Sequence, residues 1–154
     1  MALEIERKFL VRDESFIAEA TSSSLIAQAY LSVRPTVRLR LRDEEAYITI
    51  KGASHDGGLS RSEWEYTIPV DEAREMMRLA HGRVVEKRRY IVPHAGHEWE
   101  VDVFVGDYEG LILAELELSS GDEDFVLPPW VAEEVTGEPQ YYNAAMALGQ
   151  GPQL

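Results

Sequence analysis

The sequence predicts a mostly β domain of the α+β kind, a closed eight-stranded antiparallel β-barrel or tunnel with helices packed outside it and at the C-terminus. Apolar and polar residues alternate with a period of two over most of the chain, which is typical of strands with two different faces. The breaks between these stretches are rich in Pro, Gly, Asp and Ser, so neighbouring strands should pair as antiparallel hairpins. About eight strands are enough to close a barrel.

The alternation marks each strand in turn. In the first, apolar Leu3 and Ile5 alternate with charged Glu4 and Glu6. Strands are expected at residues 3–11, 26–33, 36–43, 46–52, 60–68, 84–93, 98–105 and 111–119. The turns between them include Arg34-Pro35, residues 42–45, 54–58, 93–97 and 106–110.

Helical signals are fewer and more local. Asp71 is the expected N-cap of a helix over residues 72–80, and Gly82 follows its end. A second helix is expected over residues 14–20. The Pro128-Pro129 pair should open a short helix through Val135, and residues 139–148 should form a last helical piece. If that last piece plugs one tunnel mouth, it places Tyr142 and Asn143 near the mouth.

Length and composition favour one globular domain over residues 1–154, since the chain is 45% hydrophobic and 28% charged. The absence of cysteine excludes disulfides, thiolate zinc sites and cysteine nucleophiles. The alternating N-terminus is not a signal peptide, and no apolar run is long enough to span a membrane, so we expect a cytoplasmic protein. A net charge of -13 argues against nucleic-acid and membrane partners.

One face of the predicted sheet consists almost entirely of formally charged residues. It holds about 8 of the 15 basic and about 9 of the 28 acidic residues, so it is near neutral while the rest of the chain is strongly acidic. This face contains Glu4, Glu6, Lys8, Gln28, Tyr30, Arg38, Arg40, Arg42, Thr49, Lys51, Arg61, Glu63, Glu65, Thr67, Lys87, Arg89, Glu98, Glu100, Asp102, Glu115 and Glu117.

Like charges repeat along single strands of this face. Arg38, Arg40 and Arg42 should stand about 7 Å apart, and each neighbouring pair repels by roughly 2.4 kcal/mol at an effective dielectric of 20. Cross-strand acid–base pairing on a solvated face is one solution. The other is a barrel with this face inward, around a polyanion that carries a divalent metal: bases hold the phosphate oxygens and carboxylates hold the cation.

The ordered series of charged motifs resembles the CYTH superfamily, the triphosphate tunnel metalloenzymes, and most of all its short bacterial members that hydrolyse inorganic triphosphate. The resemblance covers nearly the whole chain. The matching motifs are Glu-x-Glu-x-Lys at residues 4–8, Gln28-Ala29-Tyr30, Arg38-Leu39-Arg40, Lys51-Gly52, Glu63-Trp64-Glu65, Lys87-x-Arg89, Asp102, and Glu115-Leu116-Glu117, followed by Tyr142-Asn143.

The resemblance implies a role for each matching residue. Glu4, Glu6, Glu115 and Glu117 are the expected metal ligands, with Asp102 nearby, and Glu4 and Glu6 also present the attacking water. Arg38, Arg40, Lys51, Lys87 and Arg89 would hold the triphosphate, and Glu63 and Glu65 would orient these bases or assist metal binding. Lys8 and Tyr30 would assist proton transfer. One departure is Ala29, directly before Tyr30, where the family pattern has Gly.

The implied activity is hydrolysis of inorganic triphosphate to pyrophosphate and phosphate with Mg²⁺ or Mn²⁺ as cofactor. The implied partner is therefore a small polyanionic substrate. Three alternatives remain open on the residues: a nucleoside or thiamine triphosphatase or class IV-type adenylate cyclase on the same scaffold, a non-catalytic module that binds polyphosphate or nucleotide, and a purely structural barrel. The oligomeric state does not follow from the sequence.

Overall fold

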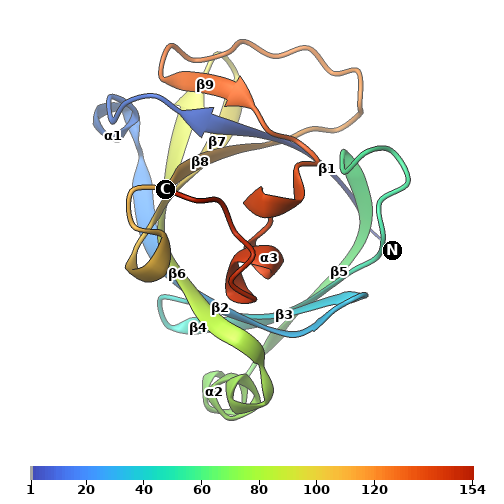
Figure 1. The fold of residues 1–154 in the computed structure, drawn as a ribbon. Coiled ribbons are helices and arrows are strands. Elements are labelled where there is room, and N and C mark those ends of the chain that lie inside the picture. The colour runs from blue at the N-terminus through green and yellow to red at the C-terminus, as the bar shows by residue number, and fades with distance from the viewer. Residues whose placement is uncertain (1) are drawn as a thin grey trace.

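Eight antiparallel strands close into a barrel in the computed structural model, which describes residues 2–154 (Figure 1). The strands are β1 (Ala2–Val11), β2 (Ser22–Val33), β3 (Thr36–Arg42), β4 (Glu45–Lys51), β5 (Ser60–Ile68), β6 (His81–His94), β7 (His97–Phe104) and β8 (Ile112–Glu117). They follow the order β5-β4-β3-β2-β6-β7-β8-β1, and pairing of β1 with β5 closes the ring. The predicted eight-stranded barrel is confirmed.

Strands β2 and β6 are longer than predicted. They pair with each other from Ser22 opposite Ile91 to Tyr30 opposite His81. Residues 22–24 lie before the predicted strand over residues 26–33, but they form the first residues of β2 because this ladder satisfies their backbone groups.

The prediction of a helix over residues 128–135 is wrong, because this part of the chain forms a short strand, β9 (Val131–Glu134). Along one edge of β1, strand β5 pairs only with Ala2–Ile5, so the far end of that edge is left open. There Phe9 lies opposite Glu134 and Val11 opposite Val131. Residues 131–134 therefore form a strand because they can pair with the open edge of β1, and this pairing outweighs the local helical preference of the segment.

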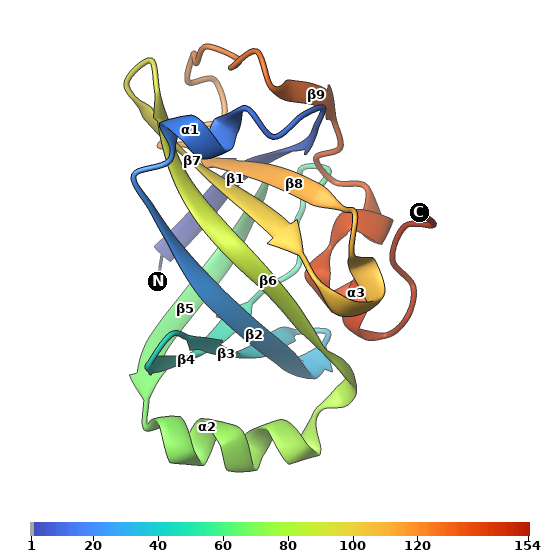
Figure 2. The same cartoon turned by 90° about the vertical axis from the view of Figure 1, so that its left-hand side faces the viewer.

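The helices are short. They are α1 (Phe16–Glu19), α2 (Val70–Met76), α3 (Asn143–Ala147) and the 3₁₀ turns η1 (Met77–Leu79), η2 (Gly106–Tyr108) and η3 (Pro139–Tyr141). Helix α2 lies outside the barrel, between β5 and β6 (Figure 2). Its N-cap is Pro69, not the predicted Asp71, because the Pro69 carbonyl already accepts a hydrogen bond from the Ala73 amide at 3.0 Å.

The main hydrophobic core lies outside the barrel wall, as the inward-facing charges require. Outward residues of β1 and β7, such as Phe9 and Trp99, are covered by Phe16 of α1 and by Trp130, which precedes β9. The Trp99 ring lies 5.5 Å from Phe9 and 5.8 Å from Trp130, in tilted and edge-on arrangements that aromatic pairs favour. The barrel is therefore held from its outside, which leaves its lumen free for polar groups.

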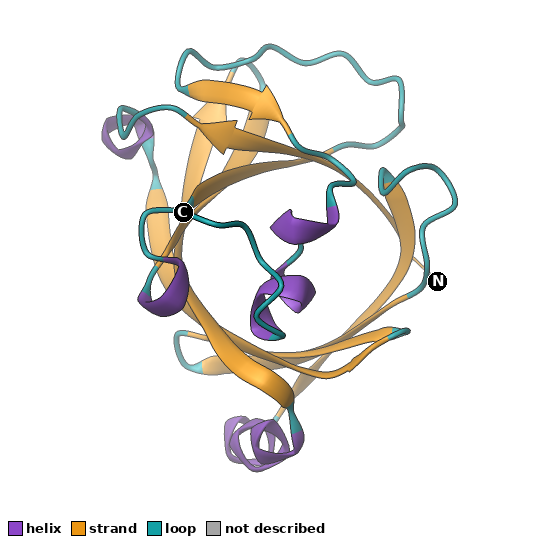
Figure 3. Ribbon diagram, viewed as in Figure 1, coloured by secondary structure: helices purple, strands orange, loops and turns teal. Residues whose placement is uncertain are grey.

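The C-terminal segment, residues 139–148, enters one mouth of the barrel instead of packing on its wall (Figures 1 and 3). Met146 and Ala147 of α3 are buried there, and Tyr108 donates a hydrogen bond to the Met146 carbonyl at 3.1 Å. Gly82 permits this approach: a Cβ at this position would lie 2.1 Å from the Ala147 carbonyl oxygen, and its φ is +74°. Within residues 2–154, no helix has the length and apolar character needed to cross a membrane.

Candidate active site

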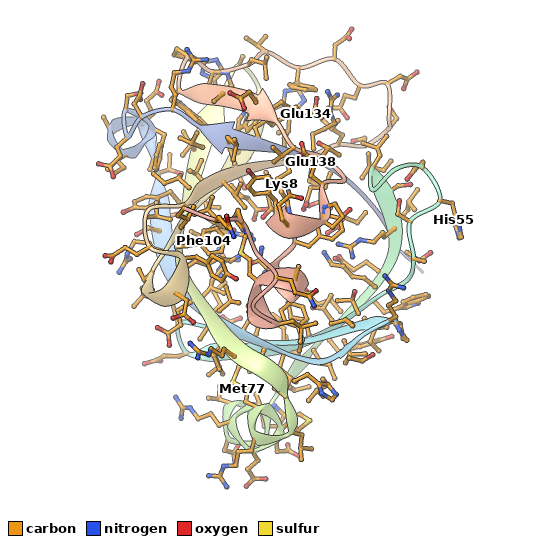
Figure 4. All side chains as sticks on the ribbon, in the orientation of Figure 1. Lys8, His55, Met77, Phe104, Glu134 and Glu138 are labelled. Carbon is orange, nitrogen blue, oxygen red and sulfur yellow. The ribbon has the colours of Figure 1, made fainter. Side chains whose placement is uncertain are left out.

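The barrel encloses a cavity of about 810 Å³ whose wall carries charges of both signs. Side chains from all around the ring point toward it, Lys8 among them (Figure 4). The structure brings together thirteen of the fourteen predicted site residues as lining residues: Glu4, Glu6, Lys8, Tyr30, Arg38, Arg40, Lys51, Glu63, Glu65, Lys87, Arg89, Glu115 and Glu117.

The strand register explains why these residues meet. Alternate residues of a strand face the same side, and antiparallel pairing sets residues of neighbouring strands opposite each other. Lys8 of β1 lies opposite Glu115 of β8, and Lys51 of β4 lies opposite Glu63 of β5. Each of these two lysines therefore stands next to a glutamate on the neighbouring strand.

The basic part of the wall is buried and incompletely neutralised. Arg40 and Arg38 are each 9% exposed and Lys87 is 1% exposed. Among residues 2–154, Arg40 makes no ion pair, and its Nε and Nη2 instead donate to the neutral Gln28 Oε1 at 3.0 and 2.8 Å. Burial and the neighbouring Arg38 lower the pKa of Arg40 to about 9, and burial lowers the pKa of Lys87 to about 7. Such a site favours a bound anion, because an anion restores the charge balance.

Asp102 is the one predicted site residue that does not line the cavity. It is fully buried. Its oxygens accept from Arg89 Nε at 2.8 Å and Nη2 at 3.0 Å, and its Oδ2 lies 2.6 Å from Lys87 Nζ. Burial alone would raise the pKa of Asp102, but the charges of Arg89 and Lys87 outweigh this effect, so its pKa lies below the ordinary value. Its carboxylate therefore holds two basic residues, and one of them, Arg89, also donates from Nη2 to Glu115 at 3.4 Å.

The acidic part of the wall gathers carboxylates on β1 and β8. Glu6 lies opposite Glu117 in the register, and Glu115 is two residues from Glu117 on the same face of β8. Burial and the charge of Glu115 raise the pKa of Glu6 well above its ordinary value. Burial alone would also raise the pKa of Glu115, but Lys8 and the hydrogen bond shared with Glu6 hold it well below its usual range. The two pKa values move in opposite directions because two adjacent buried carboxyl groups resist ionising together.

The remaining two predicted metal ligands differ in their surroundings. Glu4 accepts from Lys51 Nζ at 3.0 and 2.9 Å, and Lys51 and Arg61 outweigh burial to lower its pKa. Glu117 has a raised pKa, caused by burial and by the charges of Glu4 and Glu100.

The donor set of these four glutamates fits a hard divalent cation, which takes carboxylate oxygens and would relieve their repulsion. In the described part of the chain, no three Asp, Glu or His side chains already stand in a metal-holding group.

Lys8 and Tyr30 both line the cavity without contacting each other. Lys8 Nζ donates to the Tyr141 carbonyl at 3.0 Å and lies 5.1 Å from the centre of the Tyr142 ring. The Tyr30 hydroxyl accepts from Gln28 Nε2 at 3.2 Å. Ala29, the departure from the family pattern, is fully buried opposite Leu39, and Tyr30 still lines the cavity.

Several lining residues were given no role by the sequence. Gln28 and Arg61 were placed on the charged face by parity alone, and both line the cavity. Tyr142 and Asn143 were expected near the mouth, and they line the cavity itself. The C-terminal segment brings these residues together in two pairs: Arg61 lies 5.5 Å from the centre of the Tyr142 ring, and Gln28 donates to Asn143. The strand pattern alone does not predict either contact.

Fold and site together define a class of protein, namely closed antiparallel β-barrels whose lumen carries clustered bases beside clustered carboxylates. The chain belongs to the CYTH domain family, whose domain matches residues 2–144. Membership of this family of triphosphate tunnel metalloenzymes implies a divalent metal ion.

Two relatives resemble this chain over almost its full length. A protein of Acetivibrio thermocellus named inorganic triphosphatase is 42% identical over 147 residues, which cover 94% of this chain and 92% of the relative. A protein of Nitrosomonas europaea with the same name is 41% identical over 153 residues, which cover 94% of this chain and 97% of the relative.

Solved structures show the same fold. The crystal structure of an inorganic triphosphatase aligns with a TM-score of 0.68 at 35% identity and covers 96% of both chains. A protein of Pyrococcus furiosus aligns with a TM-score of 0.62 at 23% identity, covers 77% of this chain and 80% of its own, and shares the fold alone.

Proposed function

We propose that this protein is a divalent-metal-dependent hydrolase that converts inorganic triphosphate to pyrophosphate and phosphate inside the barrel. The observation that carries the proposal is the buried, under-neutralised basic group of Arg38, Arg40 and Lys87, which faces clustered glutamates across one cavity. The two full-length relatives named inorganic triphosphatase support the choice of substrate.

The basic residues bind and align the substrate. Triphosphate carries about four to five negative charges near neutral pH, so attack by water is opposed by repulsion until those charges are neutralised. Arg38, Arg40, Lys51, Lys87 and Arg89 would contact its oxygens along the cavity. Asp102 keeps Lys87 and Arg89 in place from behind, so that both present their remaining donors to the lumen.

The metal ion, Mg²⁺ or Mn²⁺, would be held by Glu4, Glu6, Glu115 and Glu117. The chemistry supplied by a bound divalent ion is neutralisation of phosphate charge and activation of water. Glu63 and Glu65 hold bases: Glu63 lies 3.5 Å from Lys51 Nζ, and Glu65 lies 3.5 Å from Arg38 Nη2.

Proton transfer completes the reaction. Water adds to a terminal phosphorus, the bridging P–O bond breaks, and the proton lost by water must leave the attacking oxygen. We assign this proton transfer to Lys8 and Tyr30, which approach the lumen from β1 and β2. We further propose that residues 1–154 act as one domain, because strands from both ends of the chain build the same cavity.

The experiment that tests this function is a product assay. Purified protein is incubated with triphosphate, ATP or thiamine triphosphate, with Mg²⁺, with Mn²⁺ or with neither. We expect pyrophosphate and phosphate from triphosphate, only when a metal is present, and slower turnover of the two larger substrates. Cyclic AMP from ATP, or faster release of phosphate from either organic triphosphate, would refute the choice of substrate.

A further inference from the structure

The C-terminal segment, residues 139–148, brings one amide side chain into the charged cavity. Asn143, the first residue of α3, accepts two hydrogen bonds at its Oδ1, from Gln28 Nε2 at 2.6 Å and from Lys87 Nζ at 2.9 Å. Both donors are buried and lie on different strands, β2 and β6. The segment in the mouth is therefore bonded to the inner wall of the barrel at the place where the basic residues gather.

Gln28 passes this contact on to the other predicted site residues. Its side chain is fully buried, and its Oε1 accepts from both Nε and Nη2 of Arg40. Its Nε2 donates to Asn143 and also to the Tyr30 hydroxyl. Because a carboxamide is planar, holding the nitrogen toward Asn143 fixes the oxygen toward Arg40. The single acceptor on the C-terminal segment thus contacts Lys87 directly and orients Arg40 indirectly, through Gln28.

We propose that Asn143 is a positioning residue of the substrate site and that the C-terminal segment completes this site. The inference rests on the proposed function, since Arg40 and Lys87 matter here as ligands of triphosphate. Without the Asn143 oxygen, two buried donors lose an acceptor, and the Gln28 amide is free to turn away from Arg40. Substrate then meets a basic group whose members no longer hold one arrangement.

A simpler role for Asn143 would be to fasten the segment in the mouth away from the substrate. The variant Asn143→Asp tests whether Asn143 lies at the substrate site. Aspartate keeps the size and the acceptor oxygen, so both hydrogen bonds and the fastening persist. It also adds a negative charge beside Lys87, which competes with phosphate. We therefore expect an unchanged or higher melting temperature of the free protein, together with a KM for triphosphate at least tenfold higher.

A matched control carries the same added charge on the same segment. Gln140→Glu lies outside the cavity lining and should leave KM within twofold of the wild type. A KM within twofold of the wild type in Asn143→Asp, or an equal rise in Gln140→Glu, would show that Asn143 lies away from the substrate and would overturn the inference.

A second variant, Asn143→Ser, tests the positioning itself and also decides the question if Asn143→Asp does not fold. Its shorter hydroxyl cannot reach both donors, so we expect the same tenfold rise in KM, and a KM within twofold of the wild type refutes the inference. Wild-type protein is assayed alongside with Mg²⁺. If the wild type hydrolyses triphosphate while both variants keep its KM, only this inference fails. If the wild type does not act on triphosphate, the proposed function and this inference fail together.

Discussion

At the scale of single residues, the cavity holds like charges close together with incomplete local compensation. Arg40 has a neutral partner, Gln28, and burial and the charge of Glu115 raise the pKa of Glu6. A protein surface rarely keeps such arrangements, since exposed charges find water or a counter-charge at little cost. Here they are buried, so their missing partners must come from what binds in the cavity.

The first prediction concerns Arg40. Its guanidinium is held on a packed strand and cannot follow a misplaced phosphate, so it acts as a preorganised donor. We expect Arg40→Ala to lower kcat/KM for triphosphate by roughly 10²- to 10³-fold, the usual loss for one preorganised donor. Steady-state kinetics with purified protein measures this.

The control for Arg40 is Arg88→Ala. Arg88 lies on the outer face of β6, where its Nη1 donates to Ser23 Oγ at 3.1 Å. This variant should keep the wild-type kcat/KM. If both variants lose activity equally, Arg40 acts through the fold and not through the substrate.

The second prediction concerns Glu117. Burial and the charges of Glu4 and Glu100 raise its pKa in the folded protein above the unfolded value. A carboxyl group with a raised pKa costs stability above that pKa, because the folded state resists its ionisation. Glu117→Gln should therefore melt at the same or a slightly higher temperature without metal, and lose most of its hydrolysis.

The readouts for Glu117→Gln are a thermal melt and an assay with Mg²⁺. Glu86→Gln, an exposed residue on β6, is the matched control and should keep full activity. Wild-type turnover by Glu117→Gln would remove Glu117 from the metal-binding set.

At the scale of elements, the period of two is enough to predict the barrel and its inward face. Each residue of a strand faces one side by its parity, so the alternation alone places Lys8, Arg40 and Glu115 on the same face. The ninth strand cannot be predicted this way. Residues 131–134 extend because β1 leaves part of one edge open, and that depends on where β5 begins, at Ser60 opposite Ile5.

The sequence pattern also predicts only part of the site. Parity places Asp102 on the charged face, but its pairing with Arg89 depends on the register of β6 with β7. The roles of Gln28 and Asn143 depend on the path of the C-terminal segment into the mouth. Each of these features arises from contacts between residues far apart in the chain, which local patterns do not encode.

The third prediction concerns the contact between β6 and α3. Gly82→Ala adds a Cβ that would lie 2.1 Å from the Ala147 carbonyl oxygen, a backbone atom that moves only with the helix. We expect a loss of more than about 2 kcal/mol in the free energy of unfolding, above the 1–2 kcal/mol typical of a left-handed residue alone. We also expect weaker triphosphate binding, since α3 carries Asn143. Urea denaturation and calorimetry measure the two effects.

Gly96→Ala is the matched control for Gly82. Gly96 also has a positive φ, +83°, but a Cβ there meets nothing within 4 Å. Gly96→Ala should lose only the part of the free energy of unfolding that a left-handed backbone conformation costs, and it should keep its affinity for triphosphate. If the two variants behave alike, the approach of α3 to Gly82 contributes nothing to stability or binding.

At the scale of the whole molecule, charge is divided between the lumen and the exterior. The chain carries a net charge of -13, yet its buried lumen contains Arg38, Arg40, Lys87 and Arg89. A long polyanion meets the acidic exterior first and is repelled, whereas a small one can enter the mouth. The net charge of the chain therefore argues against phosphate ligands on the exterior, but it does not apply to the lumen, where basic residues gather.

The last prediction is that triphosphate and a divalent metal stabilise the fold together more than the sum of their separate effects. Triphosphate alone neutralises the bases but meets the glutamates, and metal alone neutralises the glutamates but meets the bases, so each leaves one set of repulsions in place. Together they relieve both sets. At about 100 times its dissociation constant a ligand adds roughly 2.7 kcal/mol of apparent stability, which raises a melting temperature by several degrees. Thermal melts with triphosphate, with Mg²⁺, with both, and with duplex DNA plus Mg²⁺ measure this. We expect a large shift only for the pair and almost none with DNA, whereas additive shifts would mean that the basic and acidic groups of the lumen bind their ligands independently.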